Sequence, residues 1–101
     1  MDVSAIERMI EQGRDSYEAR LALGQAHLKA EHFDQAIEHL LVACDQQPTK
    51  TMAWQLLGQA HQKKGQDTLA GQVWRQGIQV ATDNGDEQAK KVMTVWLKRL
   101  G

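Results

Sequence analysis

The sequence predicts an all-α protein, a solenoid of about six antiparallel helices arranged as helical hairpins. Two observations lead to this fold class. The five residues Leu23–His27 recur letter for letter as Leu57–His61, displaced by 34 residues, and a period of this length is typical of a helix–turn–helix repeat. No segment alternates apolar and polar residues with a period of two, so no sheet is expected.

The expected helices cover residues 3–12, 16–29, 33–46, 50–63, 67–82 and 86–99. The first helix carries a single apolar stripe, formed by Val3, Ile6, Met9 and Ile10. Such a stripe suits a terminal unit, which covers the core on one side only. Ser4 and Asp15 each precede a glutamate by three residues, and this spacing predicts capping boxes at the starts of the first two helices.

Proline and glycine mark the boundaries of the middle helices. Pro48, the only proline, ends one helix, and Thr49 or Thr51 is expected to cap the next. Gly65 marks the turn of the second hairpin, and residues 83–85 form the turn that follows it.

Gly24 and Gly58 lie inside expected helices, where glycine costs up to about 1 kcal/mol relative to alanine. We interpret them as points where a neighbouring helix approaches closely. Further small residues that allow such close approach are Ala26, Ala36, Ala60 and Ala70. Large apolar residues fill the alternate places at Leu23, Phe33, Leu40, Trp54, Leu57, Leu69 and Trp74. This alternation predicts tight packing between the helices.

The last helix follows the repeat only after a one-residue insertion, which we place in the turn at residues 83–85. With a shift of 35, Ala89, Val92 and Met93 fall on Trp54, Leu57 and Gly58. Met93 is larger than the glycine it replaces, as expected where no further helix follows.

The repeat resembles the tetratricopeptide repeat family, whose pattern is Trp-x2-Leu-Gly-x2-Tyr, then Ala-x3-Phe, then Pro. The second copy supplies Trp54, Leu57, Gly58, Ala70 and Trp74; the first supplies Leu23, Gly24, Ala36, Leu40 and Pro48. The departures are Arg20, Thr82 and the two histidines at the tyrosine position, His27 and His61. The resemblance implies a right-handed superhelical stack with capping units at 1–15 and 85–101 and repeats at 16–49 and 50–84.

The composition limits the possible functions. The net charge is −1, so no basic excess supports binding to nucleic acid. No apolar run approaches the roughly 18 residues that span a bilayer, and no secretory signal is expected. The single cysteine, Cys44, excludes an internal disulfide. We therefore expect a cytoplasmic protein without membrane insertion, and the short chain resembles small bacterial repeat proteins.

No residue pattern indicates catalysis. The sequence holds no base-activated serine or cysteine motif and no phosphate-cradling glycine loop, so neither enzyme activity nor a cofactor is expected. We interpret His27 and His61 as packing residues whose polar tips reach the helix edge. His32, His39 and Cys44 are spaced so that their side chains scatter around a helix, which predicts no metal site.

The resemblance implies where a partner binds, because in this family the first helix of each repeat lines a concave groove for an extended peptide or a helix. The corresponding residues here are Leu21, Gln25, Leu28, Lys29, Met52, Gln55, Gln59, Gln62, Lys63, Lys90, Lys91, Thr94 and Leu97. Glutamine amides can pair with a peptide backbone, and lysines outnumber glutamates on this face. We expect an adaptor whose protein partner carries acidic residues, with solvated helix positions as the alternative interpretation.

A second hypothesis is self-association. The last helix is apolar on more than one face, and exposed Leu97 and Leu100 would suit a weak homodimer or a regulatory subunit of a larger complex. The alternative is that Leu100 folds back onto the helix that begins at Asp67. The family's carboxylate clamp, built of lysine and asparagine, is disfavoured because Leu21, Gln25 and Leu56 stand at three of its positions.

Overall fold

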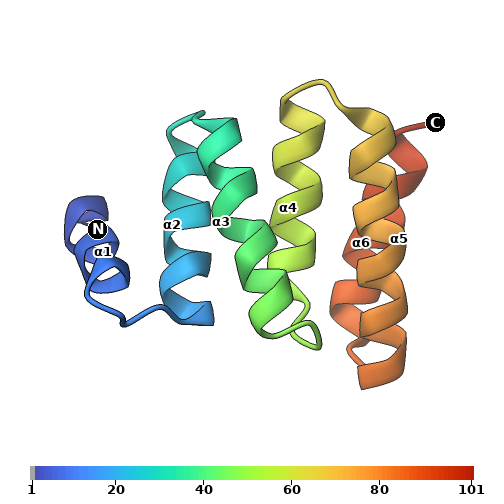
Figure 1. Ribbon diagram of the computed structural model, residues 1–101. Helices are drawn as coiled ribbons and strands as arrows, with labels where there is room; N and C mark the ends of the chain where they lie inside the picture. Colours follow the sequence, from blue (N-terminus) through green and yellow to red (C-terminus); the bar gives the residue numbers. More distant parts are fainter. Residues whose placement is uncertain (1) are drawn as a thin grey trace.

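The computed structural model describes residues 2–101 and contains six helices and no strand in that range (Figure 1). The helices are α1 (Val3–Glu11), α2 (Tyr17–Lys29), α3 (Phe33–Gln46), α4 (Met52–Lys63), α5 (Asp67–Asn84) and α6 (Glu87–Arg99). Every expected helix is present, and its ends lie within two residues of the expected ones. Met1, the first residue of the expected N-terminal unit, lies outside the described residues.

The helices follow one another side by side, so that the chain advances from α1 at one end to α5 and α6 at the other (Figure 1). Each helix packs against its neighbours in sequence, and α1 packs against α2 alone among the described helices. Helices α2 and α4 also touch each other, as do α4 and α6. These three helices therefore form one continuous face of a molecule that measures 40 × 29 × 18 Å.

The first two helices are capped by residues other than those expected. Asp2, not Ser4, caps α1 by accepting a hydrogen bond from the backbone amide of Ala5 at 3.2 Å. Ser16 caps α2 in the same way through the amide of Ala19 at 3.1 Å. The capping-box prediction was wrong at both helices: the predicted cap lies two residues after the observed one at α1 and one residue before it at α2. The distance of three residues to a glutamate does not by itself show which residue has the extended backbone of a cap.

Neither threonine before α4 caps it with its side chain. The Thr51 hydroxyl instead donates to Asp86 Oδ2 at 2.7 Å, and the Thr49 carbonyl accepts from the side-chain amide of Asn84. Asp86 also caps α6, because its Oδ1 accepts from the amide of Ala89 at 3.1 Å. The start of α4 is thus tied to the turn between α5 and α6.

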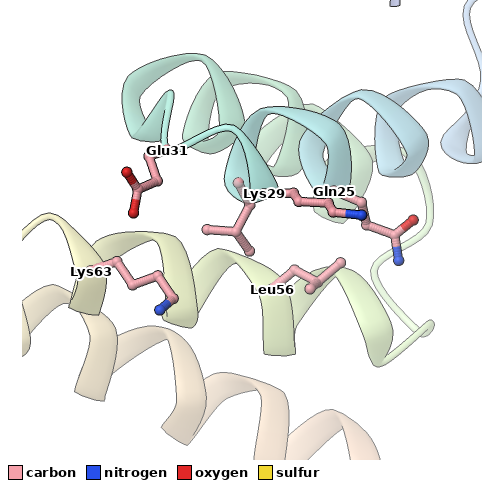
Figure 2. Close-up of a pocket in the computed structure, with 6 residues that line it drawn as sticks. Gln25, Lys29, Glu31, Leu56 and Lys63 are labelled. Carbon is pink, nitrogen blue, oxygen red and sulfur yellow. The ribbon is translucent and has the colours of Figure 1, made fainter. Parts of the chain in front are cut away.

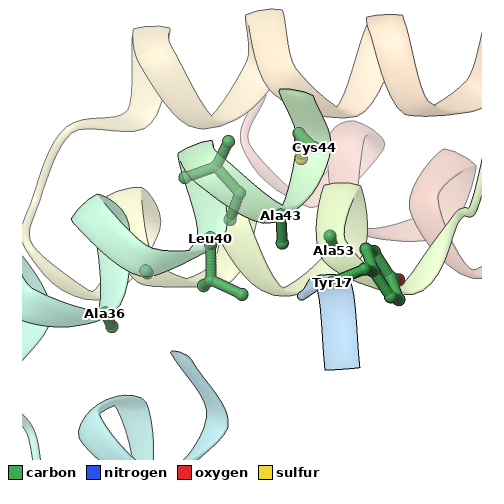
Figure 3. Packing of buried hydrophobic residues seen from close by; sticks show 8 residues of the cluster. Tyr17, Ala36, Leu40, Ala43, Cys44 and Ala53 are labelled. Atoms are coloured by element: carbon green, nitrogen blue, oxygen red, sulfur yellow. The ribbon is translucent and has the colours of Figure 1, made fainter. Parts of the chain in front are cut away.

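The core consists of two adjoining clusters. The first joins α2, α3 and α4 (Figure 3) and contains Tyr17, Ala36, Leu40, Ala43, Cys44, Ala53, Leu57 and Ala60. The second joins α5 and α6 and contains Ala70, Trp74, Ala81, Ala89 and Met93. Trp54 packs against both and links them. Burial raises the pKa of the Cys44 thiol to about 12, so this side chain is neutral and acts as an apolar core residue.

The expected close contacts at Gly24 and Gly58 are confirmed. A Cβ atom at Gly24 would overlap the side chain of Leu40, and one at Gly58 would overlap the indole ring of Trp74. Leu40 and Trp74 are fully buried, and the Trp74 indole donates to the carbonyl of Gln55 at 3.2 Å. Leu69, which was expected among the large packing residues, is 41 % exposed instead.

The C-terminal helix closes the far end of the stack. Met93 is fully buried, and its sulfur lies 2.5 Å from the position that a Cβ atom would take at Gly77. The rings of Trp74 and Trp96 lie 5.4 Å apart between their centroids. Leu100 packs against the second cluster, so it folds back onto α5 as the alternative interpretation expected.

Candidate interaction surface

An open hollow of about 320 Å³ lies between α2 and α4 on the face that α2, α4 and α6 share (Figure 2). Its lining residues are Gln25, Leu28, Lys29, Glu31, Leu56 and Lys63. Lys29 comes from α2 and Lys63 from α4, so a lysine stands on each side of the hollow (Figure 2). Leu28 and Leu56 also line the hollow and supply an apolar floor. The hollow therefore combines an apolar base with two cations and one carboxylate.

A second hollow, of about 520 Å³, continues from the first at Gln25 toward the start of α4. Its lining residues are Tyr17, Leu21, Gln25, Thr49, Lys50, Thr51, Met52 and Asp86. Lys50 lies 4.9 Å above the ring of Tyr17 and 3.7 Å from the Glu18 carboxylate. Met52 is 44 % exposed here. The two hollows together form one shallow channel, which runs along the α2–α4 seam.

Helical spacing explains why these side chains share one face. Leu21, Gln25 and Leu28 follow one another at intervals of four and three residues, and so lie along one side of α2. The contact glycines Gly24 and Gly58 lie on the sides of α2 and α4 that meet α3 and α5. The same close contacts that build the core therefore fix which residues of α2 and α4 remain available for a partner.

The structure brings six of the thirteen expected groove residues to the channel: Leu21, Gln25, Leu28, Lys29, Met52 and Lys63. Gln59 is half-buried on α4 and is not among the lining residues of either hollow. The channel also contains Tyr17, Glu31, Lys50, Leu56 and Asp86, which the groove list omitted. Leu56 directly follows Gln55 in the chain, so it would have been predicted if the set of groove positions on α4 had been one residue wider.

The remaining expected residues line neither hollow. Gln55, Lys90 and Thr94 are half-buried, and Gln62 is exposed. The Thr94 hydroxyl donates to the carbonyl of Lys90 at 2.7 Å, within its own helix. Lys91 lies in a separate hollow on α6 with Glu87, Gln88 and Val92. Leu97 contacts α5 beside Gly71, because α6 turns this side toward the end of the stack. The structure therefore does not bring Lys91 and Leu97 to the α2–α4 channel.

Three of the four histidines gather at the first hairpin, which the spacing argument did not anticipate. The Nδ1 atoms of His27 and His32 lie 3.4 Å apart across the α2–α3 turn. The ring of His39 stacks on that of His27 at 5.6 Å between centroids, and its Nδ1 lies 3.1 Å from Arg20 Nη1. Burial lowers the pKa of His39, and the Arg20 cation lowers it further. The prediction of scattered side chains concerned His32, His39 and Cys44, and both contacts here are made by His27, which the turn brings close to α3.

Other kinds of site find little support in the described part of the chain. Among residues 2–101, no group of three or more histidine, cysteine, aspartate or glutamate side chains is arranged to hold a metal ion. None of the described helices is both long and apolar enough to cross a membrane. The channel between α2 and α4 remains the main candidate surface.

Comparison with known proteins agrees with this architecture. A tetratricopeptide repeat family model matches residues 17–60. The TPR repeat-containing protein PA0015 of Pseudomonas aeruginosa is 39 % identical over 100 residues, which are 99 % of this chain and 95 % of that protein. A shorter match, 44 % identical over 46 residues, covers 46 % of this chain and 12 % of FK506-binding protein 5 of Rhizopus delemar.

A solved structure shows the same fold over nearly all of this chain. The solution structure of protein BPP2914 from Bordetella parapertussis superposes with a TM-score of 0.86 at 37 % sequence identity. The match covers 99 % of this chain and 87 % of that one. The full-length relative, the family match and this structure together show that the chain belongs to the tetratricopeptide repeat family.

Proposed function

We propose that this protein is an adaptor that binds an acidic protein segment, extended or helical, in the channel between α2 and α4. Tetratricopeptide repeat proteins are generally non-enzymatic scaffolds, and membership in the family supports protein–protein interaction as the general role. The position of the site and the character of the segment are the finer part of the proposal. In it, residues 16–49 and 50–84 act as the two binding repeats, with end units at 1–15 and 85–101.

The apolar floor of the channel is the first support. Leu21 and Leu28 from α2 and Leu56 from α4 line the two hollows, and Met52 is exposed at the start of α4. Apolar side chains in a concave surface, surrounded by polar groups, are typical of a surface that receives a partner. The Gln25 amide, which lines both hollows, can donate to a backbone carbonyl of a bound segment and accept from its amide.

Charge is the observation that most directly indicates an acidic partner. Lys29 and Lys63 stand on opposite sides of the first hollow, and Glu31 is the only carboxylate among its lining residues. In the described structure, neither lysine forms a salt bridge, whereas the neighbouring Lys64 pairs with Asp34. Two cations on opposite sides of an apolar floor complement a segment in which acidic residues flank an apolar one.

The same residues argue against recognition of a terminal carboxylate by a lysine–asparagine clamp. Leu21 and Leu56 put apolar surface where such a clamp needs polar groups, and both line the channel. We therefore propose that the partner binds through an internal segment.

Self-association through α6 receives less support than the channel. Leu97 and Leu100, which that hypothesis requires to be exposed, lie within van der Waals distance of the Gly71 position on α5. Val95 is the one large apolar residue of α6 that is clearly exposed, at 46 %. A single exposed valine is not the contiguous apolar patch that a stable dimer buries.

The proposal can be tested by selecting binding peptides of about 20 residues from a display library, long enough to span the molecule as an extended chain. We expect the selected sequences to place Asp or Glu on either side of an apolar residue. Their binding should shift the amide NMR signals of α2 and α4, and the double variant Lys29→Glu with Lys63→Glu should weaken it by at least about tenfold.

The matched control is Lys91→Glu with Arg75→Glu, which makes the same change in net charge away from the channel. We expect this control to bind the selected peptides as the unaltered chain does. Equal weakening by both double variants would contradict a specific role for Lys29 and Lys63. Signals that shift on α5 and α6 instead would contradict the location of the site.

A further inference from the structure

The turn between α2 and α3 places two imidazole rings side by side, with their centroids 5.6 Å apart and their planes tilted by 44°. His27 lies in the last turn of α2, and His32 immediately precedes α3. The backbone amide of His32 donates to the carbonyl of His27 at 2.8 Å, which fixes the two residues relative to each other. The same nitrogen of each ring, Nδ1, points to the other, and these atoms lie 3.4 Å apart.

The second hairpin shows that this turn does not require two histidines. A shift of 34 residues carries His27 onto His61 and His32 onto Gln66. There His61 Nδ1 lies 2.9 Å from the Gln66 side-chain oxygen, at the length of an ordinary hydrogen bond. The backbone bond is also kept, since the amide of Gln66 donates to the carbonyl of His61 at 2.9 Å. The same turn therefore forms without a second histidine, so the turn itself does not explain why the first hairpin carries two.

The distance between the two nitrogens suits a shared metal ion. A hydrogen bond donated by nitrogen is usually shorter, about 2.7–3.2 Å. Two imidazole nitrogens that bind one zinc ion tetrahedrally, each about 2.0–2.1 Å from it, are separated by about 3.3–3.4 Å. The observed 3.4 Å matches this separation, so the two nitrogens need not move apart or together to share an ion.

The surroundings hold one of the two rings in place and leave room for solvent. His39 stacks in parallel on His27, with an angle of 8° between the ring planes, and Arg20 in turn contacts His39 Nδ1. His39 therefore presents its face to His27, so we assign it a positioning role. The ionisable groups that act on His39 are Arg20, His27, Glu38 and, from α1, Glu7. His32 is exposed, so water can complete the coordination.

We propose that His27 and His32 form a two-histidine site for a divalent transition-metal ion of the zinc and copper class. Neutral imidazole is a preferred ligand of these ions, and copper(II) binds such nitrogen sites more tightly than zinc. The ion would join the last turn of α2 to the first residue of α3. It would therefore stabilise the first hairpin. Neither histidine is among the lining residues of the α2–α4 channel, and this proposal stands independently of the proposed function.

Two reciprocal variants test the site. His32→Gln gives the first hairpin the histidine–glutamine pair of the second. Gln66→His gives the second hairpin the histidine–histidine pair of the first. Zinc chloride is titrated into each full-length chain, prepared without a histidine tag, and binding is measured by calorimetry. The ring nitrogens of the histidines are followed in parallel by NMR.

We expect one zinc ion per unaltered chain, at least about tenfold weaker binding by His32→Gln, and a second ion bound by Gln66→His. The Nδ1 signals of His27 and His32 should shift on addition of zinc. Binding by His32→Gln that equals that of the unaltered chain would overturn the proposal, because the ion would then lie elsewhere. Nδ1 signals that zinc leaves unchanged would overturn it as well.

Discussion

At the scale of single residues, some side chains that the local sequence pattern assigned to a helix cap instead connect two different helices. Asp15 is the clearest case, because it precedes α2 without capping it. Its carboxylate accepts from Arg20 at 2.9 and 2.8 Å and from the side-chain amide of Gln46 at 2.9 Å. These bonds connect the start of α2 to the end of α3. The hydrogen bond from Arg20, followed by that from Gln46, lowers the pKa of Asp15 to about 2.

This pKa predicts how the stability contributed by Asp15 depends on pH. An aspartate in an unfolded chain has a pKa of about 3.9. Because the folded value is lower, the contribution is fully present above pH about 4 and is lost as the pH falls toward 2. The pair is exposed to solvent, so Asp15→Asn should reduce the free energy of unfolding at pH 7 by only about 0.2–1 kcal/mol.

Urea unfolding at pH 7 and at low pH checks this expectation. The difference between the unaltered chain and Asp15→Asn should shrink as the pH approaches 2. Asp45→Asn removes the same charge from an exposed position of α3 and serves as the control. A difference that stays constant with pH would show that the ionised carboxylate is not the source of the effect.

At the scale of the helices, close packing depends on which glycines face a large neighbour. Gly58 faces the Trp74 indole, which is fully buried and hydrogen-bonded, and so cannot move aside. Gly71 is also inside a helix, but a Cβ atom there would lie 3.5–3.7 Å from the side chains of Arg75, Leu97 and Leu100. These distances are ordinary van der Waals contacts.

The two glycines should therefore respond to alanine in opposite ways. Gly58→Ala should lower the free energy of unfolding by about 1–3 kcal/mol, because the added methyl group overpacks the α4–α5 contact. Gly71→Ala should raise it by about 0.5–1 kcal/mol, because glycine in a helix interior is less favourable than alanine. Chemical unfolding of both variants measures this directly, and destabilisation of similar size by both would contradict the explanation.

Local patterns in the sequence predicted the helices and their closest contacts. The 34-residue period places Gly24 and Gly58 correctly, because both the helix and the neighbour it meets recur with the repeat. Contacts across turns were missed for a physical reason. The distance between His27 and His32, and the bond between Thr51 and Asp86, depend on how the chain reverses direction, which spacing along a single helix does not describe.

The residues of the proposed binding surface were predicted better on α2 than on α6. Positions on α2 follow an intact repeat frame, and four of the four expected there line the channel: Leu21, Gln25, Leu28 and Lys29. Positions on α6 rest on a frame shifted by one residue, and there Lys91 and Leu97 face other surfaces. Among the described helices, α6 packs against α5 and, less extensively, against α4, and these contacts determine which side it buries.

At the scale of the whole molecule, the two ends of the stack differ in how well they are covered. Helix α6 closes the C-terminal end with the fully buried Met93 and a half-buried Trp96. Helix α1 closes the N-terminal end, but it contains no buried residue and packs only against α2. In a solenoid, the stability of each unit comes from its own structure and from its contacts with its neighbours.

Helix α1 should therefore open at a lower free energy than the rest of the molecule. Native-state hydrogen exchange should find the fastest exchange among the helical amides of Val3–Glu11 and the slowest in α4, which lies between the two core clusters. Equal protection of α1 and α4 would show instead that the stack opens as one cooperative unit.

The positions of the aromatic residues determine what spectroscopy can observe in this protein. All three tryptophans, Trp54, Trp74 and Trp96, belong to α4, α5 and α6, and the first hairpin contains only Tyr17 and Phe33. Intrinsic tryptophan fluorescence thus reports on the C-terminal half of the stack, whereas circular dichroism averages over all six helices. If the two signals give the same unfolding midpoint, the halves unfold together; an earlier transition by circular dichroism would come from the N-terminal half, which the fluorescence does not detect.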